Sequence, residues 1–353
     1  MPVSGGSEIK KYILEVVGLK KHFPARGGNP FVRSQRTVKA VDGVDFAVKP
    51  GEVVAVVGES GCGKSTLGRL VVRLLEPSFG AVRVDDEDVT HVAGSDLNQL
   101  RSKAQIVFQD PFGSLNPRMT VGEAVAYPLK VNGKIKRCDT KAAQKRAIEL
   151  LEKVGLSAAH ARRLPHELPG GQRQRVGIAR AIALNPQLVV LDEPVAALDL
   201  SAQARVLNLF KDLQREFGMA YLFITHDLSV AEYMADRILV VYAGKIMEIG
   251  ERASMFHEPK HPYTEALFSA AVLDGRGERE ETILDGDPPS TIDPPPGCRF
   301  NTRCPYAGPI CTLEEPQLSE ISSTHQAACH LLTGKLRRRS TVEHEAPAQV
   351  TAI

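Results

Sequence analysis

A glycine-rich loop that follows a short apolar run carries the residues best suited to chemistry. Residues 53–57 read Val-Val-Ala-Val-Val, and Gly58, Gly63, Lys64 and Ser65 then fit the spacing G-x-x-x-x-G-K-[ST]. In that pattern backbone N–H groups surround phosphates, the lysine neutralises the outer ones, and the hydroxyl ligates Mg²⁺. We predict a buried strand and a phosphate loop (residues 58–66), with an ordinary glycine-rich turn as the alternative. The predicted nucleotide-binding residues of the loop are Gly58, Ser60, Gly61, Cys62, Gly63, Lys64, Ser65 and Thr66.

Two carboxylates stand at the end of a second apolar run. Residues 188–191 read Leu-Val-Val-Leu, and Asp192 and Glu193 follow directly. Ligands of α/β sheets bind at the carboxyl ends of the strands, which is where this pair is expected to lie. A carboxylate there can hold Mg²⁺, and its neighbour can polarise an attacking water. The alternative is a strand end with two solvated acids.

A third stretch, residues 168–175, reads Leu-Pro-Gly-Gly-Gln-Arg-Gln-Arg and precedes a predicted helix. Two glycines at the start of a helix allow an anion to approach closely. At this point the sequence resembles the ATP-binding-cassette (ABC) family, whose signature reads Leu-Ser-Gly-Gly-Gln. The motifs that carry the resemblance lie in the order found in the family and span roughly residues 12–250.

The resemblance implies roles for four further residues. Gln109 matches the glutamine that senses Mg²⁺ and water, and His226 matches the switch histidine that contacts the γ-phosphate. Asp199 matches the D-loop, and Phe23 lies where the family often stacks an aromatic ring on adenine, although a core phenylalanine is the alternative. The expected catalytic residues are therefore Glu193, His226 and Gln109; the expected Mg²⁺ ligands are Ser65, Gln109 and Asp192; and the residues expected to serve the ATP site of a second cassette are Pro169, Gly170, Gly171, Gln172 and Asp199.

One residue departs from the family pattern. The signature serine is Pro169 here, which has neither a hydroxyl nor an N–H to offer a γ-phosphate. Because proline is tolerated at the first helical position, the helix and its dipole are expected to survive. Two cassettes of this family pair head to tail, so our hypothesis is that Pro169 weakens the site built on the partner's loop. The alternative is that Gly170, Gly171 and the dipole suffice.

The order of predicted elements indicates the fold class. Strands are expected at residues 12–17, 44–48, 53–57, 81–84, 104–108, 188–191, 221–225 and 238–241, and helices at 66–75, 141–154, 202–217 and 228–234, with a loop over 19–37. This alternation predicts an α/β P-loop cassette with a mostly parallel sheet, an antiparallel β part and an inserted helical subdomain. The expected domains are the cassette at 1–255 with its helical subdomain at about 110–185, an extension at 256–335, and a basic disordered tail at 336–353.

Composition limits the remaining function classes. The chain has 353 residues, 43% apolar, with 44 basic and 42 acidic side chains and a net charge of +2. With so small a net charge, the protein as a whole has no positive electrostatic field that would attract nucleic acid. Neither a signal peptide nor a run of 18 uncharged apolar residues is present. We expect a soluble cytoplasmic protein that can sit on a membrane-spanning partner.

A second family resemblance lies beyond residue 250. His261-Pro262-Tyr263-Thr264, a proline-rich linker at 287–297 and the motif Cys-Arg-Phe-x-x-Arg-Cys-Pro at 298–305 resemble the extension of oligopeptide and dipeptide importer ATPases, with nickel importers as close relatives. Four thiols there suit a four-iron, four-sulfur cluster, which some relatives carry, or Zn²⁺. Unliganded buried cysteines are the third reading. The four are Cys298, Cys304, Cys311 and Cys329.

Together the resemblances imply the ATP-hydrolysing motor subunit of a peptide importer. Its expected cofactors are ATP and Mg²⁺, and its expected partners are two membrane-spanning permease subunits, a second ABC ATPase subunit and, indirectly, an extracytoplasmic substrate-binding protein. The expected location is the cytoplasmic face of the inner membrane. The alternatives are a low-turnover partner subunit with a degenerate signature and a soluble ABC ATPase outside transport.

Overall fold

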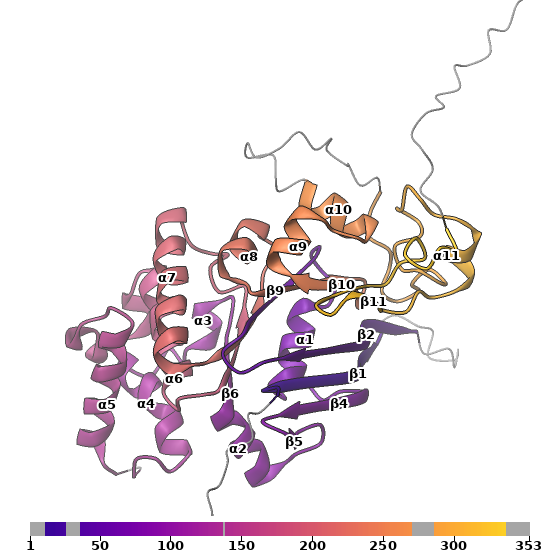
Figure 1. Cartoon of the computed structure of the whole chain (residues 1–353). Coiled ribbons are helices and arrows are strands. Elements are labelled where there is room, and N and C mark those ends of the chain that lie inside the picture. Colours follow the sequence, from indigo (N-terminus) through magenta and orange to yellow (C-terminus); the bar gives the residue numbers. More distant parts are fainter. Residues whose placement is uncertain (1–10, 26–35, 137, 270–285, 337–353) are drawn as a thin grey trace, which may run out of the picture.

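The computed structural model describes residues 11–25, 36–136, 138–269 and 286–336. Two sheets and their covering helices make up the chain, and the predicted fold class is confirmed (Figure 1). An eight-stranded sheet has the order β11-β12-β10-β9-β3-β8-β7-β6, and a four-stranded antiparallel sheet has the order β2-β1-β4-β5. The strands are β1 Leu14–Pro24, β2 Thr37–Val48, β3 Val53–Val57, β4 Phe79–Val84, β5 Glu87–Asp88, β6 Ala104–Val107, β7 Leu188–Asp192, β8 Ala220–Ile224, β9 Arg237–Tyr242, β10 Lys245–Glu251, β11 Ser319–Ser322 and β12 His325–Ala327.

Five neighbouring strands of the larger sheet, from β9 to the edge strand β6, are parallel. β3 pairs with β8 on one side and β9 on the other, and β7 joins β8 to β6. β3, β7 and β8 are buried along their whole length, which explains why their sequences are continuous apolar runs. Side chains alternate between the two faces, so Val54 and Val56 join one core cluster while Ala55 and Val57 join another.

The antiparallel sheet is longer than its sequence suggests. β1 continues to Pro24 and pairs there with Thr37, the first residue of β2, so the prediction of a loop over 19–37 was wrong for residues 19–24 and for Thr37. All four residues from Lys20 to Phe23 are half-buried, and strands of that kind give no continuous apolar signal. Helix α1, Lys64–Val71, packs against β2, β7 and β8 and so lies between the two sheets.

Helices pack beside β6, the edge strand of the large sheet. α4 (Val121–Val131), α5 (Thr140–Lys153) and α6 (Gly170–Ile182) pack against one another on the left of Figure 1. Gly155 follows the end of α5 with φ of 75°, the left-handed conformation typical of a glycine at the C′ position. The other helices are α2 Gly94–Lys103, α3 Pro111–Ser114, α7 Leu200–Phe217, α8 Leu228–Met234, α9 Arg252–His257, α10 Pro262–Ser269 and α11 Pro309–Leu313, with 3₁₀ turns at Ala158–Arg162 and Pro165–Glu167.

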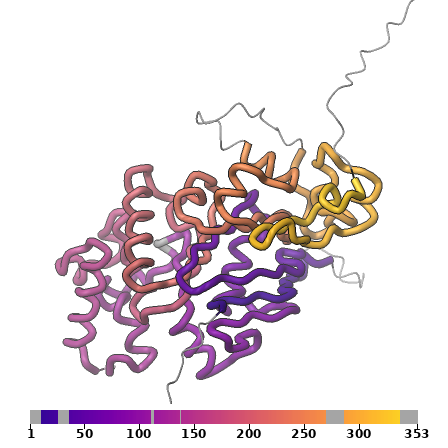
Figure 2. The backbone as a smooth tube through the Cα atoms, viewed as in Figure 1, coloured from indigo at the N-terminus to yellow at the C-terminus, as the bar shows by residue number. Residues whose placement is uncertain are grey.

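The C-terminal extension is built onto the cassette. β12 pairs with β10 of the large sheet, and β11 pairs with β12, so the extension lengthens the sheet by two strands. Cys298, Phe300 and Cys311 are buried in one core cluster with residues of β3, β9 and α10. The extension therefore shares a core with the cassette, and it lies beside the N-terminal strands from which it is far removed in sequence (Figure 2). Within the described residues, no helix is long and apolar enough to cross a bilayer.

Candidate functional site

Four neighbouring parallel strands of the large sheet have their C-terminal ends side by side, and predicted site residues lie at each of these ends. The phosphate loop follows β3, and His226 lies two residues after β8. Asp192 ends β7 and Glu193 follows it, while Gln109 lies two residues after β6. The strand order β3-β8-β7-β6 therefore brings together residues that are spread over 169 positions of sequence, from Gly58 to His226.

The phosphate loop has a backbone that only glycine fits. Gly58 has φ of 147° and Gly63 has φ of 109°. A Cβ at Gly58 would lie 2.1 Å from the carbonyl oxygen of Val241, and a Cβ at Gly63 would lie 2.1 Å from that of Ala40. The Lys64 ammonium donates hydrogen bonds to the carbonyl oxygens of Gly58 at 2.6 Å and Glu59 at 2.8 Å. Two of its three N–H donors thus hold the loop, and the ammonium also lies 3.7 Å from Cys62 Sγ, a weak acceptor.

A hydroxyl and a buried carboxylate meet below the loop. Ser65 Oγ donates a hydrogen bond to Asp192 Oδ1 at 2.7 Å. Asp192 is 2% exposed, and burial raises its pKa, although the Ser65 hydrogen bond and the charge of Arg69 oppose this. A buried carboxylate whose charged form is unfavourable and a neighbouring hydroxyl are a donor set that fits Mg²⁺, because a hard dication prefers oxygen ligands and offsets the carboxylate charge.

Glu193 stands at the centre of the predicted catalytic residues. Its Oε2 accepts a hydrogen bond from Gln109 Nε2 at 3.0 Å and lies 3.3 Å from His226 Nδ1. The backbone of Glu193 has φ of 47°, which is uncommon for a residue other than glycine, and its N–H donates to the carbonyl of Ile224. Strained backbone of this kind is often found at functional sites. The arrangement holds a carboxylate oxygen between an amide and an imidazole.

A cleft of about 550 Å³ opens over these groups. Sequence analysis missed three residues of its wall, namely Val38, Ala40 and Thr291. Thr291 comes from the proline-rich linker, and its carbonyl oxygen accepts a hydrogen bond from the N–H of Lys39 at 2.8 Å. Phe23 does not line the cleft, although it pairs with Val38 across β1 and β2. No motif marks Thr291, so only the fold reveals it. The lining residues are Val38, Ala40, Ser60, Gly61, Gly63, Lys64, Ser65, Thr66, Gln109, Glu193, His226 and Thr291.

The signature residues lie elsewhere. Pro169 is the N-cap of α6 with φ of −58° and ψ of 156°, so it precedes the helix rather than occupying its first position as predicted. Pro169 and Gly170 are exposed, and a Cβ at Gly170 would meet no atom within 4 Å. The cleft lining includes none of residues 168–175. Asp199 caps α7 by accepting a hydrogen bond from the N–H of Ala202 at 2.8 Å.

The four cysteines of the extension are buried or half-buried. Burial raises the pKa of Cys298 to about 12 and that of Cys304 to about 11, and the neighbouring thiols add to both shifts. Among the described residues, no three His, Cys, Asp or Glu side chains are grouped so as to hold a metal ion. The thiols are thus close enough to influence one another, but they do not form a ready metal site, and the structure does not support the predicted iron–sulfur cluster or Zn²⁺.

The fold and the four strand ends define a P-loop nucleotide-binding cassette. The ABC transporter model matches residues 41–196, and the model of the oligopeptide/dipeptide transporter C-terminal region matches residues 247–311. The chain is 46% identical to the oligopeptide transport ATP-binding protein AppF of Bacillus subtilis, over 90% of this chain and 97% of that protein. It therefore belongs to the ABC transporter family, among the ATP-binding subunits of oligopeptide and dipeptide transporters.

Two further comparisons agree with this assignment. The chain is 44% identical to the probable peptide ABC transporter ATP-binding protein y4tS of Sinorhizobium fredii, over 97% of this chain and 94% of that protein. It also resembles a solved dimeric structure of a post-hydrolysis state of the ATP-binding cassette MJ0796 bound to ADP and Pi. The TM-score is 0.60 and the identity 31%, over 68% of this chain and 98% of that chain.

Proposed function

We propose that this chain is the ATP-hydrolysing motor subunit of a membrane importer for oligopeptides or dipeptides. The observation that carries the proposal is the convergence of Lys64, Ser65 and Glu193 in one cleft. The buried Asp192 accepts a hydrogen bond from Ser65, and Gln109 and His226 lie against Glu193. Relatives named as peptide transport ATP-binding proteins support the substrate class.

The residues of the cleft divide the work of phosphoryl transfer. Backbone N–H groups of the phosphate loop and the positive charge of the Lys64 ammonium bind the phosphates. Ser65 and Asp192, with Gln109 nearby, would hold Mg²⁺, which neutralises charge on the β- and γ-phosphates when bound. Glu193 orients water for attack and accepts its proton, while His226 contacts the γ-phosphate. Positioning and electrostatic stabilisation are the main contributions expected for this reaction.

A second ABC ATPase subunit completes each site in this proposal. Support comes from the exposed start of α6, which lies outside the chain's own cleft. We further propose two membrane-spanning permease subunits, indirect contact with an extracytoplasmic binding protein, and location at the cytoplasmic face of the inner membrane.

The experiment measures ATP turnover by the complex that co-purifies with the tagged chain from native membranes. Glu193→Gln keeps the size of the side chain and its hydrogen bonding, but it removes the proton acceptor. We expect MgATP binding to persist while turnover falls by about 100-fold or more. Lys64→Ala is the companion variant and should lose binding itself. ATP turnover by the Glu193→Gln complex at the wild-type rate would show that this site does not hydrolyse the ATP.

The degenerate signature favours a second candidate, a partner subunit with little turnover at one of its two sites. Pro169 caps α6 without a side-chain hydrogen bond, so the helix offers backbone groups alone at its start. If Pro169 weakens the site on the partner's loop, Pro169→Ser should raise the turnover of the complex. Unchanged turnover would mean that Gly170, Gly171 and the helix dipole are sufficient.

A metal centre in the extension stays a prediction of the sequence. Besides burial, neighbouring thiols raise the pKa values of Cys298 and Cys304, which supports a site where the cysteines gather. Against it, no three potential ligands among the described residues are grouped so as to hold a metal ion. Iron, acid-labile sulfide and zinc analysis of anaerobically purified protein decides among the cluster, zinc and unliganded thiols. Protein without any of the three would remove both metal readings.

A further inference from the structure

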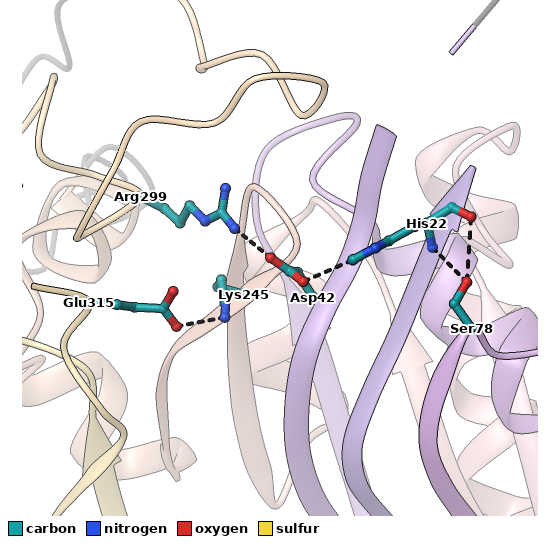
Figure 3. A network of polar contacts seen from close by, with 6 residues as sticks. All are labelled: His22, Asp42, Ser78, Lys245, Arg299 and Glu315. Atoms are coloured by element: carbon teal, nitrogen blue, oxygen red, sulfur yellow. Dashed lines mark hydrogen bonds and ion pairs between the residues drawn. The ribbon is translucent and has the colours of Figure 1, made fainter. Parts of the chain in front are cut away.

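Two arginines of the extension reach the cassette at different places. Arg299 Nη2 lies 2.5 Å from Asp42 Oδ2 on β2, and this carboxylate also contacts His22 Nε2 at 2.9 Å (Figure 3). Arg303 Nη1 lies 2.9 Å from both carboxylate oxygens of Glu59, the second residue of the phosphate loop. The first contact joins the extension to the antiparallel sheet, and the second joins it to the phosphate loop.

Glu59 places a negative charge in a loop that must bind phosphates. Residues 58–66 contain one acidic side chain, Glu59, and one basic side chain, Lys64, so the formal charge of the loop is −1 + 1 = 0. A phosphate group is repelled by the Glu59 carboxylate and attracted by the Lys64 ammonium. With Arg303 paired to Glu59, the group of three carries a charge of +1, and Lys64 acts on the phosphates without opposition.

The surroundings hold this pair in place. The side chain of Arg303 is 7% exposed and that of Glu59 is 22% exposed, so solvent screens the pair weakly. The guanidinium lies 5.9 Å from the ring centroid of Tyr242 and donates a hydrogen bond to its hydroxyl at 3.3 Å. Tyr263 accepts a hydrogen bond from the backbone N–H of Glu59 at 3.0 Å. Phe300 packs against both tyrosines, with ring centroids 5.4 Å apart in each case.

We propose that Arg303 is a positioning residue of the ATP site, which neutralises Glu59 and holds its carboxylate so that the phosphate loop presents net positive charge to a nucleoside triphosphate. The extension thereby sets the MgATP affinity of its own chain. The arginine acts through Glu59 and touches no reacting atom. This inference rests on the nucleotide-binding function proposed above.

The test is a double-mutant cycle on MgATP affinity, measured by isothermal titration calorimetry with the full-length chain. Arg303→Ala leaves the carboxylate unpaired and should weaken binding about tenfold, whereas Glu59→Gln leaves the arginine charge unopposed and should tighten binding about threefold. The double variant is neutral at both positions and should return to within about twofold of wild type. Higher salt should shrink both single effects.

A matched control removes another ion pair between the extension and the cassette. Lys245 of β10 and Glu315 of the extension lie 2.6 Å apart, and neither side chain lines the cleft over the phosphate loop. Glu315→Gln should leave MgATP affinity unchanged, and thermal melting of every variant shows whether it is folded. If the wild-type chain binds no MgATP, the proposed ATPase function itself is wrong.

The other outcomes bear on Arg303 alone. Wild-type affinity in Arg303→Ala would overturn the inference, and so would a double variant as weak as Arg303→Ala, because the arginine would then act through folding and not through the charge of Glu59. If Arg303→Ala does not fold, Glu59→Gln decides: affinity equal to or weaker than wild type contradicts the proposed role.

Discussion

Mild acid should destabilise the chain through His261, a buried histidine at the start of α10. Its side chain is 1% exposed, and its Nδ1 accepts a hydrogen bond from the N–H of Tyr263 at 3.0 Å. The ring proton is therefore on Nε2, which has no partner among the described residues. Burial lowers the pKa of His261 from its ordinary 6.5 to about 4, although the charge of Glu248 opposes this.

The sign and size of the effect follow from these two values. Below pH 6.5 the unfolded chain binds a proton at this position and the folded chain does not, so stability is full above pH 6.5 and falls until about pH 4. A difference of 2.5 pH units at 1.36 kcal/mol each gives a total of about 3 kcal/mol. Between pH 7.5 and pH 5.5 the loss should be about 1.3 kcal/mol.

Urea unfolding followed by circular dichroism at pH 7.5 and pH 5.5 measures this loss. His261→Asn keeps an acceptor for the Tyr263 N–H but does not ionise, and every other titrating group is common to both proteins. We expect the wild type to lose about 1.3 kcal/mol more than His261→Asn. Equal losses in the two proteins would refute the view that His261 is buried in its neutral form.

Three further predictions concern the loop, the core and the cleft. Gly63→Ala should abolish MgATP binding and lower the melting temperature, because its Cβ would lie 2.1 Å from the Ala40 oxygen at φ of 109°; calorimetry that finds normal binding contradicts this loop geometry. Leu150→Ala removes a side chain that is 0% exposed in the core around α5 and should lower the free energy of unfolding in urea by about 2–5 kcal/mol. A loss below about 1 kcal/mol would contradict this, because it would mean that neighbouring side chains fill the cavity. His226→Ala should lower ATP turnover by about 100-fold with little change in MgATP affinity, and an equal change in both would assign His226 to binding.

The parts of the site that sequence predicted are those whose signals are local. The strands at 53–57 and 188–191 are buried on both faces and therefore appear as unbroken apolar runs. The spacing of Gly58, Gly63 and Lys64 needs no tertiary information, because the tight backbone itself demands those residues. The roles of these residues in catalysis stay predictions until the variants above are measured.

The parts that sequence missed depend on contacts between distant segments. α2 buries Leu100 and half-buries Leu97, and two apolar residues are too few to predict a helix from their spacing. β12 has three residues, and its pairing with β10 is fixed by the extension as a whole. Thr291 lines the cleft because Lys39 binds its backbone, and the contact of Arg303 with Glu59 joins residues 244 positions apart. No local pattern encodes such contacts.

The most direct test of the proposed motor function is ATP-driven uptake of a labelled peptide by the co-purified complex in proteoliposomes. The substrate-binding protein is supplied on the side opposite the ATPase, and ATP is supplied on the ATPase side. We expect uptake with the wild-type chain and MgATP, and no uptake above background with Glu193→Gln. Peptide uptake by the Glu193→Gln complex at the wild-type rate would contradict the proposed motor function.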